Sequence, residues 1–277
     1  MTRQWNKKRV GIIGGGQLAR MLQEAAHPWA VDLHFLDPQA DAPVSGLSKQ
    51  FVQGDWQSAD AVEAFGSTMD VVGLEFEAIS LEGLERLEAK GIACYPGSKV
   101  LRIIQDKGKQ KQFLEESGLP TAPFHLLKEG SPVPDGPCVV KLRKGGYDGY
   151  GVKVYKEAPK AEQWPPFSGE LLIEELADID REISVMVARF PNGSLRYWDP
   201  TEMVFHEEAN MLAFQLCPAR ISGEQAQKAQ ELAAEAAEKL GLIGLLAVEF
   251  FLLKDGELWI NEMAPRPHNS GHQTIEA

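Results

Sequence analysis

The sequence predicts an α/β and α+β protein, in which a doubly wound, Rossmann-like domain precedes a strand-rich remainder. Three observations support this prediction. Near the N-terminus, an apolar strand runs into a glycine-rich turn and an amphipathic helix, and further strand–helix units follow. A proline-rich connection over residues 120–137 then indicates a domain boundary. Beyond it, strands dominate and form hairpin patterns around residues 144–151 and 254–257.

Composition and charge limit the kinds of protein that this chain can be. At 277 residues, with 44% hydrophobic and 25% charged residues, it has an ordinary globular composition and room for one large domain or about two to three small ones. Its net charge of −12 disfavours nucleic acid or an anionic membrane as a partner. The three cysteines, Cys94, Cys138 and Cys217, lack metal-ligand spacing and indicate free thiols in a reducing compartment. Since no signal-peptide pattern or apolar run of transmembrane length is present, we expect a cytoplasmic protein.

The first turn predicts a loop that approaches an anion. Arg9–Gly14 is predicted as a buried parallel strand, and Gly14–Ala19 forms a Gly-x-Gly-x-x-Ala turn into a helix that continues to about His27. The next strand, over 31–36, ends in Asp37, about where a dinucleotide fold places its ribose-binding acid, ~20 residues on. NAD binding is therefore one interpretation of this turn, and a tight strand–helix connection without a ligand is the other.

The rest of the N-terminal domain places two acids at the end of a strand. Further elements are predicted as strands over 70–75 and 92–95 and as helices over 81–90 and 98–119. Glu75 and Glu77 lie at the carboxyl end of the strand over 70–75, where doubly wound sheets bind ligands. Solvated loop acids are the alternative interpretation.

A glycine-rich loop in the second half predicts phosphate binding. The predicted strand 138–143 contains Lys141, and the loop 144–151 that follows has four glycines in its last seven residues before a second strand, 152–155. Backbone N–H groups in such a loop can surround phosphates. It is not a Walker A loop, because Gly-Lys-Ser/Thr is absent and a strand follows instead of a helix. A mobile surface hairpin is the alternative, but a lysine inside the strand favours phosphate contact.

Three further elements are predicted in the second half of the chain. The strand 170–176 ends in acids, which suggests an edge that reads adenine with backbone groups and holds ribose hydroxyls with a carboxylate. Another strand is predicted over 180–189. A long helix over 222–240 has Ser222 as its N-cap and Gln225 in the position that completes a capping box.

The last hairpin predicts a magnesium site. Two apolar strands flank 254–257, and each carries one acid among apolar neighbours, Glu249 on the first and Glu262 on the second, next to Asn261. Two carboxylates facing each other across a hairpin repel unless a cation lies between them, and such hard oxygen ligands suit Mg²⁺. Solvent-facing acids are the alternative. The polar run over 266–272 makes that alternative less attractive.

The order of these elements resembles the ATP-grasp superfamily. Within it, the chain is similar to the N5-carboxyaminoimidazole ribonucleotide synthetase family, the ATP-dependent carboxylases of purine biosynthesis. The resemblance covers essentially the whole chain and is strongest in three motifs, residues 14–21, 145–151 and 261–272, of which the last is the most discriminating.

The resemblance implies three domains and a missing part. Residues 1–97 are expected to form a preATP-grasp domain, 98–180 a small lid domain with the glycine-rich loop, and 181–277 a central domain with the metal and nucleotide acids. Family members continue for roughly a hundred residues into a small C-terminal domain. We therefore expect part of the substrate site, and part of the interface of a homodimer, to lie outside these 277 residues.

The resemblance also implies site residues. It implies an ATP site with the basic contacts Lys107 and Lys141, the phosphate-covering loop Gly146, Tyr147, Asp148, Gly149, Tyr150, Gly151 and Val152, the adenine edge Glu174, Glu175 and Leu176, the ribose acid Glu182, and the further contacts His206, Asn261 and Glu262. It implies Glu249 and Glu262 as Mg²⁺ ligands, and it places aminoimidazole ribonucleotide at Gln17, Leu18, Glu75, Asp148, Asn269, Ser270 and His272. Asp148 or His272 is expected to move the amine proton. Position 150 is often arginine in the family and is tyrosine here, so no charged role is expected there.

The implied reaction consumes ATP and bicarbonate. Bicarbonate attacks the γ-phosphate to give carboxyphosphate, which breaks down to CO₂ in a closed site, and the ribonucleotide amine captures the CO₂. Three alternatives stay open at this point: another ATP-grasp ligase of nucleotide metabolism, an NAD(P) oxidoreductase that uses the first glycine turn, and a nucleotide-binding module without catalytic activity.

Overall fold

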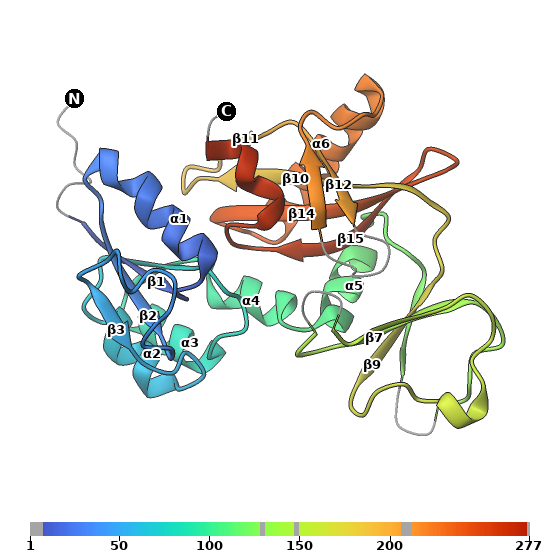
Figure 1. Ribbon diagram of the computed structural model, residues 1–277, viewed down its shortest axis with the longest axis horizontal. Coiled ribbons are helices and arrows are strands. Elements are labelled where there is room, and N and C mark those ends of the chain that lie inside the picture. The colour runs from blue at the N-terminus through green and yellow to red at the C-terminus, as the bar shows by residue number, and fades with distance from the viewer. Residues whose placement is uncertain (1–7, 128–130, 147–149, 206–211, 276–277) are drawn as a thin grey trace.

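The computed structural model describes residues 8–127, 131–146, 150–205 and 212–275. Three β-sheets follow one another along the chain, with five, four and six strands. Figure 1 shows the first sheet at the left, the second at the lower right, and the third above and between them.

The first sheet confirms the predicted doubly wound domain. All its strands are parallel, in the order β3-β2-β1-β4-β5. The elements are β1 (Arg9–Ile13), α1 (Gln17–Ala26), β2 (Asp32–Asp37), β3 (Phe51–Gln53), α2 (Ala59–Gly66), β4 (Val71–Leu74), α3 (Leu81–Ala89) and β5 (Ala93–Tyr95). Neighbouring residues of β1 point to opposite faces, because Ile12 packs with Ala19 of α1 whereas Ile13 packs with Phe65 of α2 and Leu87 of α3.

The sequence pattern does not predict β3 or α2. β3 is three residues long and mostly exposed, so it has no apolar alternation to detect. α2 is short and begins at Ser58, whose hydroxyl accepts a hydrogen bond from the amide of Ala61 at 3.3 Å.

The helical stretch over 98–119 forms two helices, α4 (Ser98–Ile104) and α5 (Lys107–Glu116). Asp106 separates them, because its carboxylate accepts hydrogen bonds from the amides of Gly108 at 2.9 Å and Lys109 at 3.3 Å and so caps α5. Apolar residues of both helices pack into the core of the third sheet. The division of the chain at residues 97 and 180 remains a prediction.

The second sheet is antiparallel and carries the glycine-rich loop. Its strand order is β6-β9-β7-β8. The strands are β6 (Phe124–Leu127), β7 (Cys138–Leu142), β8 (Val152–Tyr155) and β9 (Leu171–Glu175). The loop connects β7 to β8, as the sequence predicts.

The third sheet is antiparallel and contains the two opposed acids. Its order is β13-β12-β10-β14-β15, with β11 paired to β10. The strands are β10 (Ile179–Arg189), β11 (Leu195–Tyr197), β12 (Thr201–Phe205), β13 (Leu212–Leu216), β14 (Gly244–Leu253) and β15 (Leu258–Ala264), followed by the 3-10 helix η4 (Asn269–Ile275). The helix α6 (Gly223–Lys239) packs its alanines on the sheet and begins with the predicted capping box of Ser222 and Gln225.

The chain segment just before the second sheet is bound to the third sheet. The carbonyl of Pro120 accepts a hydrogen bond from the amide of Ile260 at 2.8 Å, and Thr121 forms an isolated parallel bridge with the same residue. The strand β15 therefore holds the chain just before it enters the second sheet.

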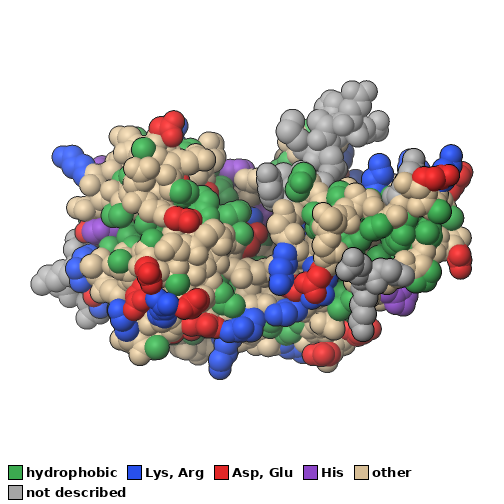
Figure 2. All heavy atoms as spheres, turned by 90° about the horizontal axis from the view of Figure 1, so that it is seen from below, with side chains coloured by type: hydrophobic (Ala, Val, Ile, Leu, Met, Phe, Trp, Pro, Cys, Tyr) green, Lys and Arg blue, Asp and Glu red, His purple; other side chains and the backbone are tan. Residues whose placement is uncertain are grey.

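Surface charges alternate in sign. In Figure 2, basic and acidic side chains lie next to one another on the face seen from below. Arg86 illustrates the pattern, since its guanidinium contacts the carboxylates of Asp60, Glu63 and Glu82. In the described part of the chain, no helix combines the length and the apolar character needed to cross a membrane.

Candidate active site

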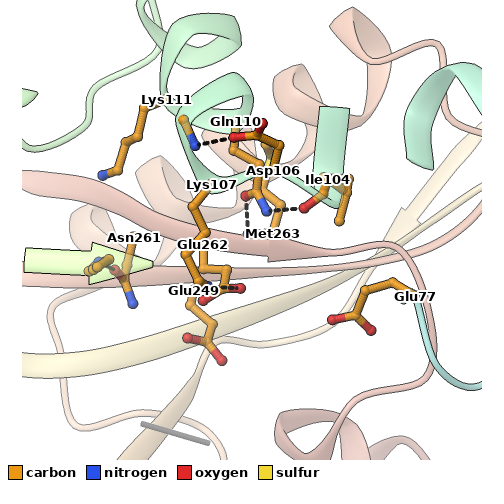
Figure 3. A network of polar contacts seen from close by, with 12 residues as sticks. Glu77, Ile104, Asp106, Lys107, Gln110, Lys111, Glu249, Asn261, Glu262 and Met263 are labelled. Atoms are coloured by element: carbon orange, nitrogen blue, oxygen red, sulfur yellow. Dashed lines mark hydrogen bonds and ion pairs between the residues drawn. The ribbon is translucent and has the colours of Figure 1, made fainter. Parts of the chain in front are cut away.

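Two carboxylates face each other on neighbouring strands of the third sheet. Glu249 of β14 and Glu262 of β15 are direct partners in the antiparallel register, and a bulge follows Glu249. Figure 3 shows both side chains with Lys107, which extends from the start of α5 toward them. The ammonium Nζ of Lys107 lies 2.5 Å from Oε1 of Glu262. The hairpin thus brings the predicted acids together, and α5 adds a cation.

The two acids have different electrostatic surroundings. Burial raises the pKa of Glu249 to about 8, and the nearby carboxylates of Glu262 and Glu182 add to the effect. Burial also acts on Glu262, but the ammonium of Lys107 outweighs it and lowers the pKa of Glu262. The pKa values of the two opposed acids are therefore shifted in opposite directions. This donor set of opposed carboxylate oxygens matches the chemistry of a hard divalent cation.

A second charge cluster adjoins the first. The Nζ of Lys141, on β7, lies 2.7 Å from Oε2 of Glu174, on β9, and donates to Oδ1 of Asn261 at 2.9 Å. The Nζ of Lys111, on α5, lies 3.0 Å from the other oxygen of Glu174. The sequence singles out three of these residues, and it misses Lys111. A helical lysine between polar neighbours usually faces solvent, so nothing in the pattern distinguishes it from the exposed Lys109.

These clusters line a single small cavity. Its walls are formed by Lys107, Gln110, Lys111, Lys141, Glu174, Asn261 and Glu262. Gln110 fixes α5 to the end of β15, because its Oε1 accepts from the amide of Met263 at 3.0 Å and its Nε2 donates to the carbonyl of Ile104 at 3.0 Å (Figure 3). Residues far apart in the sequence thus meet at the junction of the second and third sheets.

The glycine-rich loop begins next to this cavity. A Cβ atom added to Gly146 would lie 3.8 Å from Cε of Lys107 and 2.9 Å from the carbonyl oxygen of Tyr150. Gly151 has a φ of +77° and leads into Val152 at the start of β8. The predicted residues Tyr147, Asp148 and Gly149 lie outside the described residues, as does His206.

The strand β9 continues from the cavity to the surface. Glu174 is 2% exposed, whereas Glu175 and Leu176 are exposed, and the amide of Glu175 donates to the carbonyl of Pro123 at 3.0 Å. Glu182 lies on β10, and burial raises its pKa against the opposing attraction of Lys141. The predicted adenine edge therefore includes both a buried acid and exposed positions.

A separate group of predicted residues lies where the first domain approaches η4. Leu18 of α1 and His272 of η4 line one groove, which is otherwise mostly apolar. Ser270 is buried, and its hydroxyl lies 2.7 Å from Oγ of Ser184 and 2.9 Å from Nδ1 of His268. The backbone carbonyl of Asn269 accepts from Gln215 at 2.7 Å. Gln17 opens α1 directly after the glycine turn.

Carboxylates of the protein itself occupy the glycine turn. The amide of Gly15 donates to Oδ2 of Asp37 at 2.8 Å, and Cβ atoms added to Gly14 or Gly16 would lie 2.5 Å and 2.7 Å from carboxylate oxygens of Glu75. Burial raises the pKa of Glu75. The glycines are therefore needed for close approach of Glu75, and Asp37 stabilises the turn from within. This arrangement favours a structural role for Asp37 over ribose binding.

The segment between β15 and η4 contains functional candidates that the sequence did not assign. Arg266 forms an ion pair with Glu77, with one contact of 3.3 Å between Nη2 and Oε1. His268 lies 3.5 Å from Glu249 through its Nε2 atom, and burial lowers its pKa to about 4. Both residues belong to the polar run over 266–272. The sequence pattern identifies this run as a whole but does not assign a contact to Arg266 or His268.

Loss of the Arg266–Glu77 contact is expected to destabilise the protein. Glu77→Gln removes the ion-pair partner of the largely buried guanidinium of Arg266 and leaves it only the Coulombic attraction of Glu75 and Glu262, so the free energy of unfolding should fall by about 2–4 kcal/mol. Glu85→Gln removes the partner of Arg102 in an exposed pair and should cost less than about 1 kcal/mol. Urea unfolding midpoints of the two variants test this difference. Equal midpoints would contradict a stabilising role of the Arg266–Glu77 ion pair.

Comparison with protein families gives two matches that together span nearly the whole chain. Residues 7–105 match the ribonucleotide synthetase preATP-grasp domain, and residues 112–277 match the ATP-grasp domain. The N5-carboxyaminoimidazole ribonucleotide synthase of Bacillus subtilis (strain 168) is 35% identical over 276 residues, which cover 96% of this chain and 72% of that protein. The enzyme of the same name from Brucella melitensis biotype 1 is 34% identical over 278 residues, with coverage of 97% and 76%.

Solved structures show the same similarity. Carboxyaminoimidazole ribonucleotide synthase from Aspergillus clavatus, complexed with ATP, superposes with a TM-score of 0.89 at 31% identity, covering 99% of this chain and 74% of that one. The structure described as N5-carboxyaminoimidazole synthase from the same organism, complexed with ADP and 5-aminoimidazole ribonucleotide, gives a TM-score of 0.86 at 30% identity, with coverage of 99% and 73%. The chain thus spans about three quarters of the length of these relatives.

Proposed function

Since the chain belongs to the N5-carboxyaminoimidazole ribonucleotide synthase family of ATP-grasp enzymes, we propose that it carboxylates 5-aminoimidazole ribonucleotide with ATP and bicarbonate in de novo purine biosynthesis. The observation that carries the proposal is the register of Glu249 opposite Glu262 beside Lys107. This arrangement supplies opposed oxygen ligands and a basic group at one place, which phosphoryl transfer requires. The relative from Aspergillus clavatus, solved with ADP and the ribonucleotide, supports the choice of substrates.

Glu249 and Glu262 would hold Mg²⁺ together with phosphate oxygens of ATP. Their opposition raises the pKa of Glu249 in the ligand-free protein, and a divalent cation between them would remove that repulsion. Bound there, Mg²⁺ would neutralise charge on the transferred phosphoryl group. The side chains around the cavity would bind and orient the substrates.

Binding of ATP would redistribute the lysine contacts. In the ligand-free protein, Lys107 pairs with Glu262 and Lys141 pairs with Glu174. We expect both ammonium groups to turn toward the phosphates, while the loop over 146–152 covers them and Glu182 binds the ribose. Backbone groups of 174–176 would then read the adenine. These assignments remain predictions.

The reaction itself would proceed through an activated carbonate. A bicarbonate oxygen attacks the γ-phosphorus of ATP, and the bond to the β-phosphate oxygen breaks to give ADP and carboxyphosphate. Carboxyphosphate releases CO₂ and phosphate, and the exocyclic amine of the ribonucleotide attacks the CO₂ and loses a proton. Asp148 or His272 would accept that proton. Carboxyphosphate breaks down unproductively in water. A glycine-rich loop that covers the phosphates would exclude water and so protect this intermediate.

ADP release by the 277-residue chain tests the proposal directly. The assay contains Mg²⁺, ATP and bicarbonate, with or without aminoimidazole ribonucleotide, and a clear stimulation by the ribonucleotide is expected. ADP release that another amine or carboxylate substrate stimulates, but this ribonucleotide does not, would exclude the proposed substrate and leave an ATP-grasp ligase. The homodimer implied by the family is a separate prediction, which mass measurement in solution tests.

A further inference from the structure

We propose that Lys111 is a positioning residue for nucleotide binding: it neutralises the buried carboxylate of Glu174, and this leaves the charge of Lys141 for the phosphates. The inference rests on the proposed function, since it takes ATP as the ligand. Lys111 is not among the residues that the sequence pattern or the family motifs single out.

The contacts show one carboxylate shared by two lysines. Oε1 of Glu174 lies 3.0 Å from Nζ of Lys111, and Oε2 lies 2.7 Å from Nζ of Lys141. The side chains of Lys111, Glu174 and Lys141 are 3%, 2% and 11% exposed, so solvent screens these charges little. The three residues come from α5, β9 and β7, and the cluster therefore depends on how the second sheet sits against α5.

Lys111 is held in place by a chain of hydrogen bonds. Its Nζ donates to Oγ1 of Thr121 at 2.6 Å, and that hydroxyl donates to the carbonyl of Ile260 at 2.7 Å. The bridge between Thr121 and Ile260 holds this chain of hydrogen bonds in place. In Figure 3, Lys111 extends from its helix on the side of the site that carries Asn261.

Lys141 has a different second contact. Its Nζ donates to Oδ1 of Asn261, the neighbour of the metal acid Glu262. Both lysines line the cavity, but Lys111 is tied to Thr121, whereas Lys141 lies next to the strand that carries the metal acid. We therefore expect Lys141, and not Lys111, to exchange its carboxylate for a phosphate.

The balance of charge gives Lys111 its function. Two ammonium groups and one carboxylate leave one net positive charge near the phosphates. Without Lys111, the charge of Lys141 would be cancelled by Glu174, and moving Lys141 to a phosphate would leave a buried carboxylate unpaired, which is strongly unfavourable. Burial opposes ionisation of Glu174, but the two lysines outweigh it and lower the pKa of Glu174. Burial also lowers the pKa of Lys111 to about 8 against the attraction of Glu174, so the neutralising charge weakens as the pH rises through this value.

A double-mutant cycle on Lys111 and Glu174 tests the proposal. We measure the dissociation constant of MgATP by calorimetry for the full chain, for Lys111→Met, for Glu174→Gln and for the double variant. Lys111→Met should weaken binding by on the order of tenfold to hundredfold, the effect of losing a charged hydrogen-bonding partner. In the Glu174→Gln background the same substitution should change binding less than about threefold, because no buried carboxylate needs neutralising. Lys109→Met, an exposed lysine on the same helix, is the matched control and should bind MgATP normally.

Thermal unfolding of each variant separates positioning from support of the fold. A purely structural role would lower the melting temperature of Lys111→Met and leave the dissociation constant of the folded protein unchanged, and this result would overturn the proposal. An equal loss of affinity in both backgrounds would overturn it as well. The proposed carboxylation fails separately if MgATP binds and the cycle behaves as expected but the ribonucleotide does not stimulate ADP release. A full chain that does not bind MgATP would refute both.

Discussion

Glu262→Gln is expected to abolish Mg²⁺-dependent ADP formation, with a loss of at least about 10²–10³-fold in kcat. The substitution keeps the shape of the side chain but removes the negative charge that faces both the expected cation and Lys107. Glu249, whose ionisation burial opposes, would then be the only carboxylate of the pair left to hold the metal. Steady-state ADP release over a range of Mg²⁺ concentrations measures the effect.

The same hairpin provides the control for this experiment. Glu257 lies in the exposed turn between β14 and β15, so Glu257→Gln makes the same chemical change away from the site and should retain normal turnover. A melting temperature of Glu262→Gln close to that of the unmodified chain shows that the fold is intact. Normal turnover in Glu262→Gln would remove this residue from the metal site.

Glu249→Gln should stabilise the metal-free protein, and the gain should increase as the pH rises. The pKa of Glu249 is raised from 4.5 to about 8 by burial and by nearby carboxylates, so between these values the unfolded chain has lost a proton that the folded chain keeps. Folding stability of the unmodified protein therefore falls with pH in this window, by up to about 1.4 kcal/mol per pH unit from this group. Glutamine does not titrate, so the difference between the two proteins grows to several kcal/mol, on the order of 2–4, near pH 8.

Thermal unfolding in the presence of a chelator, at pH values from about 5 to 8, measures this difference. Glu75, which also has a raised pKa, affects both proteins equally and cancels in the comparison. Glu257→Gln is again the control and should show no such trend. Saturating Mg²⁺ should stabilise the unmodified protein and have little effect on Glu249→Gln. A difference that shrinks as the pH rises would contradict the raised pKa of Glu249.

Features with a local physical cause could be predicted from the sequence. The turn residues of the last hairpin predict that Glu249 and Glu262 lie on paired strands, although the bulge after Glu249 is what places the two acids directly opposite each other. The capping box of α6 is equally local, since Ser222 and Gln225 are three residues apart. By contrast, β3 is too short to show alternation, and the break at Asp106 appears only when its carboxylate is seen to cap α5.

The parts of the site that depend on distant contacts could not be predicted in this way. Lys111 and Glu174 meet because α5 packs against β9, and neither periodicity nor spacing relates one to the other. The pairing of Arg266 with Glu77 likewise joins the segment after the last strand to the first domain. Asp37 matches a ribose-binding acid by position alone, whereas in the structure it binds the amide of Gly15. Each case needs the packing of whole elements, which the residue pattern does not encode on its own.

The ion pair between Lys107 and Glu262 divides inhibitors of this cavity into two chemical kinds. A phosphate mimic offers Lys107 a new partner and, with a divalent cation, offers Glu262 one as well, so it can replace the 2.5 Å contact. A neutral compound that fills only the adenine edge offers no new partner to either residue. It must therefore bind while Lys107 and Glu262 remain paired with each other. Neutral compounds should therefore be screened against the metal-free protein, and phosphate mimics in the presence of Mg²⁺.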